Sequence, residues 1–188
     1  EDGVAGEGGG EGGEPTEIYD VNFALQSQGA TATAKSGNNP GEANDGNEGS
    51  RWWSATGTDE APMTEEEEHN QWWQVNLGQR RIFNTIQILW EGAWGKSFDI
   101  QISDDGAAWT TVKQIRDQNI VGPFPYLQTI ELDEKKIAQY VRFQGIERGT
   151  GYAYSFWEFR VLLPNVSVLT TIDLKAGTNI AKLGGEGI

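Results

Sequence analysis

The stretch "SFDIQISDDGAAWTTVKQI", residues 97–115, has the pattern of a β-hairpin. Phe98, Ile100 and Ile102 alternate with polar residues, and a spacing of two places these apolar side chains on one face of a strand. The Asp-Asp-Gly run that follows is typical of a tight turn, because glycine and aspartate tolerate the backbone conformations that turns need. The segment 107–115 then fits as the returning strand. This part of the chain is therefore expected to fold as antiparallel sheet.

The same alternation recurs on both sides of this hairpin. Apolar residues have no 3.6-residue period long enough for a substantial helix, and Gly, Asn and Asp turns separate the segments. Short strands of this kind predict an all-β domain, an antiparallel sandwich or barrel, over residues 20–164. The further strand-like stretches are "RIFNTIQILW" (81–90), "LQTIEL" (127–132), "QYVRFQGI" (139–146) and "FWEFRVLL" (156–163).

The two ends of the chain have a different character. Seven of the first thirteen residues are glycine, and residues 1–19 contain several acidic residues but no Lys or Arg. Such a segment buries too little apolar surface to offset its ordering entropy, so an extended acidic tether is predicted. After Pro164, residues 165–188 resemble the start of a further β module of immunoglobulin-like type, which suggests a longer multidomain chain.

Composition narrows the function classes. The net charge of −14 disfavours nucleic-acid binding, which needs clustered Lys and Arg, and it disfavours anionic membrane surfaces. With no cysteine and one histidine, the sequence offers no nucleophilic constellation, and nothing marks a catalytic cleft. Eight tryptophans are many for one domain, and exposed aromatic rings are the groups that stack on sugars. A neutral or cationic ligand or a metal ion suits an acidic surface.

The order of five motifs resembles one known family. Residues 20–163 closely resemble the discoidin, or coagulation factor V/VIII C-type, domain, and within that superfamily the bacterial family 32 carbohydrate-binding modules. The resemblance implies a jelly-roll β-sandwich (galactose-binding-domain-like), a structural calcium ion, and ligand-binding loops at one end. The motifs are "ATATAKSG" (30–37), "ANDGNEGSRWWS" (43–54), "QWWQVNLG" (71–78), "IQILWEGAWGKSFDIQISDDGAAW" (86–109) and "QYVRFQGIERGTGYAYSFWEFRVL" (139–162).

The loop "NDGNEGS", residues 44–50, is the candidate calcium site. Calcium takes six to eight oxygen ligands, and a glycine-bearing turn can direct several carbonyls at one centre. From the residues alone, a plain Asx turn with a solvated glutamate on the strand is the favoured interpretation. Alternation in "WEFRV" predicts that Glu158 points away from the apolar face. The resemblance implies side-chain ligands from Asp45, Ser50 and Glu158, and carbonyl ligands from Glu42, Asn47, Ser50 and Trp157.

The resemblance places the ligand site in other loops. Glu91 would accept hydrogen bonds from sugar hydroxyls, and Trp94 would stack on a pyranose ring or cap the core beneath. Arg148 would donate several fixed hydrogen bonds, or pair with an acid and shape the loop. Three further candidates complete the set: Tyr152, Trp53 and His69. His69 follows the Glu65–Glu68 run, where a solvated surface is expected.

These observations predict a non-catalytic carbohydrate-binding module, monomeric and linked to further domains, in an exported bacterial protein attached to the cell surface. The alternative is a protein-binding or adhesion domain that uses the same loops. The acidic insert 56–70 favours that alternative for a basic partner. Membrane insertion is disfavoured because the loop tryptophans have mostly acidic neighbours, and an enzyme is the remaining rival.

Overall fold

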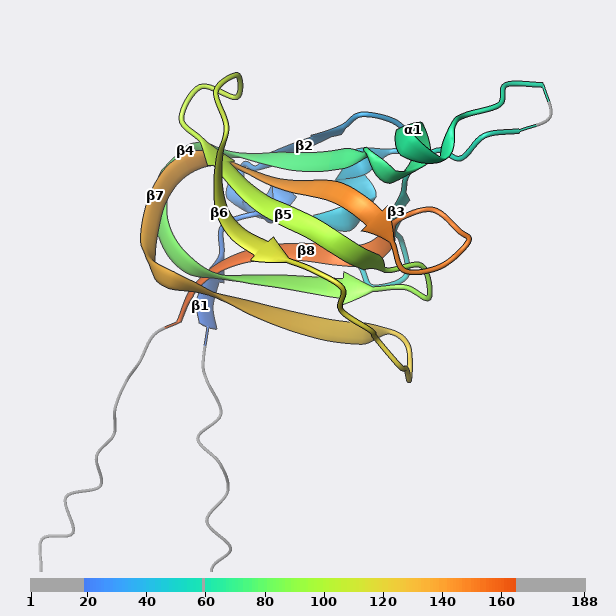
Figure 1. Ribbon diagram of the computed structural model, residues 1–188. Coiled ribbons are helices and arrows are strands. Elements are labelled where there is room, and N and C mark those ends of the chain that lie inside the picture. The colour runs from blue at the N-terminus through green and yellow to red at the C-terminus, as the bar shows by residue number, and fades with distance from the viewer. Residues whose placement is uncertain (1–18, 59, 165–188) are drawn as a thin grey trace, which may run out of the picture.

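The computed structural model describes residues 19–58 and 60–164, which form an antiparallel β-sandwich (Figure 1). The fold class is as predicted, and the quoted hairpin is β5–β6. The longest helix has five residues, and no helix in the described ranges is long and apolar enough to cross a membrane. The expected tether and the expected C-terminal module fall almost wholly outside the described residues. The strands are β1 (Tyr19–Asn22), β2 (Thr31–Ala34), β3 (Trp52–Trp53), β4 (Trp72–Trp90), β5 (Gly95–Ser103), β6 (Thr110–Ile115), β7 (Tyr126–Arg148) and β8 (Ser155–Pro164), and the helices are η1 (Gln26–Gln28), η2 (Pro40–Ala43) and α1 (Glu65–His69).

Two long strands, β4 and β7, connect the two layers of the sandwich. Residues 72–76 of β4 pair with residues 140–144 of β7, and this layer continues through β5 to β6, with β2 on its other side. Residues 85–90 of β4 pair with β8 and with the beginning of β7 to form the other layer. Register shifts between these halves let both strands turn from one layer into the other.

Aromatic side chains fill the space between the layers. Trp73 from one layer lies 5.0 Å from Phe159 of the other, and Trp90 lies 5.7 Å from Phe143, measured between ring centroids. All four residues are fully buried. Tilted and edge-on ring pairs of this kind contribute about 0.5–1.5 kcal/mol each beyond the area that they bury.

The ends of the domain and its candidate binding loops lie apart. Tyr19 pairs with Pro164, so β1 and the end of β8 lie side by side. Figure 1 shows α1, β3 and the loop between β7 and β8 toward the other end of the sandwich. The loops at that end therefore lie away from Tyr19 and Pro164.

Candidate functional site

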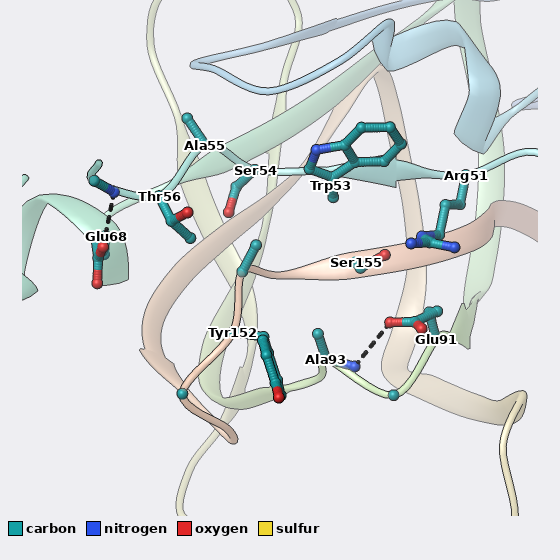
Figure 2. A pocket seen from close by; sticks show the side chains of 14 residues that line it. Arg51, Trp53, Ser54, Ala55, Thr56, Glu68, Glu91, Ala93, Tyr152 and Ser155 are labelled. Carbon is teal, nitrogen blue, oxygen red and sulfur yellow. Dashed lines mark hydrogen bonds between the residues drawn. The ribbon is translucent and has the colours of Figure 1, made fainter. Parts of the chain in front are cut away.

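An open cleft of about 650 Å³ lies at the loop end of the sandwich (Figure 2). Its walls come from three segments far apart in the sequence, residues 51–57, 91–93 and 151–155, together with Glu68 from α1. Figure 2 shows the Trp53 indole and the Tyr152 ring on opposite sides, with Arg51 and Glu91 at one end.

The alternation of β3 positions one wall of this cleft. Trp52 is fully buried, and its Nε1 donates a hydrogen bond to the Ser36 carbonyl. Its neighbours Arg51 and Trp53 therefore project outward, and the Trp53 side chain is 44% exposed. The Arg51 guanidinium lies 5.5 Å from the Trp53 ring centroid and 5.0 Å from that of Trp157. These stacks hold the guanidinium in place while its charge faces the cleft.

Glu91 sits at the end of β4, where the chain leaves the sheet. Its backbone N–H donates to the Ser155 carbonyl, and its Oε2 accepts the Ala93 N–H at 3.2 Å. No salt bridge involves Glu91 in the part of the chain that the structure describes. The carboxylate therefore keeps acceptor capacity and charge for a ligand.

Glu68 and Arg148 form an ion pair beside the cleft. The Arg148 Nη2 lies 2.6 Å from the Glu68 Oε2, and the two side chains are 9% and 17% exposed. Arg148 also donates to the Tyr152 carbonyl, and Glu68 accepts the Gly57 N–H. Of the two expected roles of Arg148, the structure shows the pair with an acid that shapes the loop, and its guanidinium does not line the cleft. It joins α1 to the β7–β8 loop instead, and Glu68 is not the solvated residue expected.

His69 also has a structural position. Its Nδ1 accepts the Arg148 N–H at 2.9 Å, and its carbonyl accepts the Tyr154 hydroxyl. The histidine lines a second hollow of about 470 Å³ on the other side of α1, with Glu65, Glu66 and neighbours of β7. The side chain is 19% exposed, so His69 is not the solvated loop residue expected, and it does not line the main cleft.

Trp94 is the clearest correction among the aromatic residues. Its side chain is only 7% exposed and belongs to the core, so the predicted stacking face is covered. Gly149 lies against the ring, because a Cβ at Gly149 would come within 2.3 Å of Trp94 Cε3. Trp94 therefore caps the core beneath the loops, which was the alternative interpretation of this residue.

Of the six predicted ligand residues, the structure brings Glu91, Trp53 and Tyr152 around one cleft. Tyr152 is 75% exposed in the β7–β8 loop. Sequence reasoning missed Arg51 and Glu68. The alternation around the buried Trp52 could have identified Arg51 as the outward neighbour of Trp53. Nine further lining residues were missed: Ser54, Ala55, Thr56, Gly57, Gly92, Ala93, Gly151, Ala153 and Ser155.

The candidate calcium loop lies against β8. The Gly46 N–H donates to Glu158 Oε1 at 2.9 Å, and Glu48 pairs with Arg160 at 2.6 Å. Asp45 accepts the Asn47 N–H and the Ser50 hydroxyl. The loop thus joins the beginning of the domain to its last strand, as the sequence predicts. Glu42 lies in η2, where its carboxylate accepts the Asn38 amide.

The surroundings of Glu158 test the fit of a cation. The side chain was expected to point away from the apolar face, and it is 1% exposed because the loop covers it. Burial, with a contribution from Asp45, raises the pKa of Glu158 to about 7. Its Oε2 is buried without a hydrogen-bond partner. An orphaned carboxylate oxygen facing a second carboxylate is a donor set that suits calcium, with carbonyls of the loop, Trp157 and Ser50 as further oxygens.

The chemistry available in the cleft is recognition. Two rings, one unpaired carboxylate and one guanidinium can contact apolar sugar faces, hydroxyls and a positive charge. In the described ranges no group of three or more His, Asp or Glu side chains converges on a metal-binding centre. The acid with the raised pKa, Glu158, does not line the cleft.

Comparison with known proteins identifies the fold family. The model of the F5/8 type C domain matches residues 27–159. No curated protein matches the chain. The crystal structure of chitosan-binding module 1, derived from a chitosanase/glucanase of Paenibacillus sp. IK-5, is 36% identical, with a TM-score of 0.61, and the match covers 75% of this chain and 98% of that one.

Two other solved structures are similar. Chitosan-binding module 2 from the same Paenibacillus chitosanase/glucanase, in complex with chitotriose, is 29% identical with a TM-score of 0.60, covering 74% of this chain and 98% of that one. The family 32 module of C. perfringens NanJ, in complex with galactose, is 23% identical with a TM-score of 0.56, covering 73% and 95%. This last likeness concerns the fold alone. The sandwich, the motif order and these matches together show that the chain belongs to the F5/8 type C, or discoidin, domain family.

Proposed function

We propose that this domain is a non-catalytic carbohydrate-binding module whose glycan binds in the cleft between Trp53 and Tyr152. The observation that carries the proposal is the cleft itself, in which two exposed rings face the space that Arg51 and Glu91 border. A pyranose stacked on a ring would present its hydroxyls to these polar groups. The similarity to chitosan-binding modules supports a glycan ligand.

Charge favours a cationic, amino-sugar glycan. Glu68 is neutralised by Arg148, so Glu91 is the cleft carboxylate left to meet an ammonium group of the ligand. Arg51 also lines the cleft, and its guanidinium would donate to hydroxyl groups of the same glycan. The chain as a whole carries a net charge of −14, which attracts cationic polymers. A carboxylate that accepts from an ammonium group forms a charge-assisted hydrogen bond, about twice as strong as a neutral one.

Calorimetric titration with chitosan-derived oligomers tests the proposal. Wild type should bind with a Kd in the range of about 10 μM to 1 mM, because so few contacts leave only about 4–7 kcal/mol. Trp53→Ala should abolish measurable binding. Glu91→Gln should weaken binding about tenfold, by ~1.4 kcal/mol, while it keeps the oxygen that accepts the Ala93 N–H.

Glu131→Gln is the matched control for Glu91→Gln. Glu131 is exposed on β7, does not line the cleft, and its substitution changes the net charge equally. If both variants lost the same amount of affinity, binding would depend on the overall charge and not on a contact from Glu91. No binding of chitosan, galactose or glucan oligomers by wild type would refute the glycan proposal, and binding to a basic protein that salt weakens strongly would favour the adhesion alternative.

The second part of the proposal is a structural calcium ion held by Asp45 and Glu158. The orphaned Glu158 Oε2 and the raised pKa of this carboxyl support it, since a cation would compensate a buried charge. Carbonyls from Glu42, Asn47 and Trp157 and the Ser50 hydroxyl would complete the oxygen set. When bound, the ion would tie the loop to β8 and contribute to stability.

Thermal unfolding with calcium and with a chelator tests this part. Calcium should raise the Tm of wild type, and Asp45→Ala should remove that response while glycan affinity at a folded temperature changes little. Glu48→Gln, in the same loop, should keep the calcium response. An unchanged Tm across millimolar calcium would refute the site.

We also propose that the chain is an exported bacterial protein, monomeric and linked to further domains. The Paenibacillus modules, which derive from a chitosanase/glucanase, support the bacterial source and the link to further domains.

A further inference from the structure

The segment between β6 and β7 exposes an unusual amount of apolar surface. Of the nine exposed large hydrophobic side chains among the described residues, four lie within residues 121–127, and two more, Trp53 and Tyr152, line the cleft. We call residues 121–127 the apolar segment. The exposed fractions of its large side chains are 78% for Val121, 40% for Phe124, 39% for Tyr126 and 45% for Leu127. Concentrated apolar exposure of this kind marks an interaction surface.

The apolar segment is fixed beside the loop that carries Glu91. Tyr126 pairs with Trp90, the residue directly before Glu91. Gln128 accepts the Trp90 indole N–H at 2.7 Å and donates to Gln118 at 2.7 Å. Gln118 in turn donates to the Gly95 carbonyl at 2.6 Å. These side-chain hydrogen bonds attach both ends of the segment to the two sides of the 91–94 loop.

This arrangement makes the apolar segment a preformed surface. Pro123 and Pro125 restrict its backbone, and Ile120 at its base packs against the core. A surface that is already ordered loses little entropy when a ligand binds. Figure 1 shows the β6–β7 connection at the same end of the sandwich as the β4–β5 and β7–β8 loops.

We infer that the apolar segment is a second subsite for the same glycan chain, with the Phe124 and Tyr126 rings stacking on sugars beyond those held in the cleft. This inference rests on the proposed glycan function and extends it to ligand length. Glu91 and Gly92 line the cleft, and Trp90, directly before them in the chain, pairs with Tyr126 of the apolar segment. An anionic lipid surface is a poor occupant because the chain carries a net charge of −14.

Binding of oligomers of different lengths distinguishes this subsite from the cleft. Titrations compare a chitosan-derived disaccharide with a hexasaccharide from the same source, using wild type, Phe124→Ala and Tyr126→Ala. Each substitution should weaken hexasaccharide binding about fivefold to tenfold, where tenfold corresponds to ~1.4 kcal/mol, and leave disaccharide binding unchanged. Both side chains are partly exposed, so the variants should fold, and an unchanged thermal unfolding profile checks this.

Two controls make the outcome specific. Val121 lies in the same segment but has no ring, so Val121→Ala should bind both probes as wild type does. If Val121→Ala weakened hexasaccharide binding as much as the ring variants do, general apolar contact and not ring stacking would explain the binding. Trp53→Ala should lose both probes. If wild type binds neither probe, the glycan function itself fails. If wild type binds both and Trp53→Ala does not, yet Phe124→Ala and Tyr126→Ala match wild type on the hexasaccharide, only the second subsite is refuted.

Discussion

Breaking the Glu68–Arg148 ion pair should destabilise the domain and loosen its binding loops. The atoms of this pair are 2.6 Å apart, and both side chains are largely buried. In Arg148→Met, the Glu68 carboxylate keeps only the Gly57 N–H, and the Tyr152 carbonyl loses its donor. Removing one partner of a buried pair costs about 3–5 kcal/mol, and the partial exposure of Glu68 points to the lower end.

Urea unfolding of wild type, the two single variants and the double variant measures this cost. Glu68→Gln and Arg148→Met should each lower the free energy of unfolding by about 3 kcal/mol, which corresponds to roughly 10 °C in Tm for a domain of this size. The double variant should lose clearly less than the sum, by at least ~1.5 kcal/mol, because it leaves no unpaired buried charge. Additivity within ~0.5 kcal/mol would refute the reasoning.

Glycan binding is the second readout for the same variants. Arg148 does not line the cleft, so its substitution should act through the β7–β8 loop that carries Tyr152. Arg148→Met should therefore weaken binding of every oligomer by a similar factor, with no dependence on ligand charge. A loss confined to amino-sugar ligands would instead indicate a direct contact from Arg148.

Three further predictions concern single positions. Burial raises the pKa of Glu158 to about 7 from the ordinary 4.5, so between these pH values the calcium-free native protein keeps a proton that the unfolded chain releases. Urea unfolding in the presence of a chelator should therefore show that this group makes the domain about 3 kcal/mol less stable above pH ~7 than below pH ~4.5. Glu158→Gln should abolish that difference. Gly149→Ala should lower Tm by roughly 5 °C or more, because the new methyl would overlap the Trp94 ring, and an unchanged Tm would contradict the packing. Glu48→Gln removes an exposed pair with Arg160 and should cost less than ~1 kcal/mol of unfolding free energy; a cost equal to that of Glu68→Gln would contradict the role of burial.

The β-sandwich could be predicted because apolar and polar residues alternate along a strand that has one face on the core. In β5, Phe98 and Ile100 are fully buried and Ile102 packs against the core, so the period of two marks the core face, although Asp99 between them is buried as well. The same rule is incomplete at Glu158, where the register shifts between Leu89 and Trp90 and a loop from the beginning of the domain covers the side chain. A strand pattern distinguishes the core from the outside, but it does not report that another segment covers the outside.

The binding loops were less predictable for a related reason. Whether Trp94 is a platform or a core cap depends on the approach of Gly149, some fifty residues later in the chain, and no local pattern contains that contact. Arg148 had two open roles in the sequence, and the position of Glu68 on α1 decides between them. Trp53 and Tyr152 have no such partner across the fold, and both remain exposed.

The candidate calcium loop and the cleft are continuous in the chain, which limits how the two sites can influence each other. Ser50 ends the loop, and Arg51 begins the cleft wall. The Arg51 guanidinium stacks on Trp157, which directly precedes the buried Glu158. A cation that neutralises Glu158 would therefore act on the glycan site through this stack. Any such coupling must be reciprocal, because linkage requires bound glycan to strengthen calcium binding by the same factor. The Gly46 and Glu48 contacts to β8 already hold the loop, so the coupling should be small compared with the stability that the ion contributes.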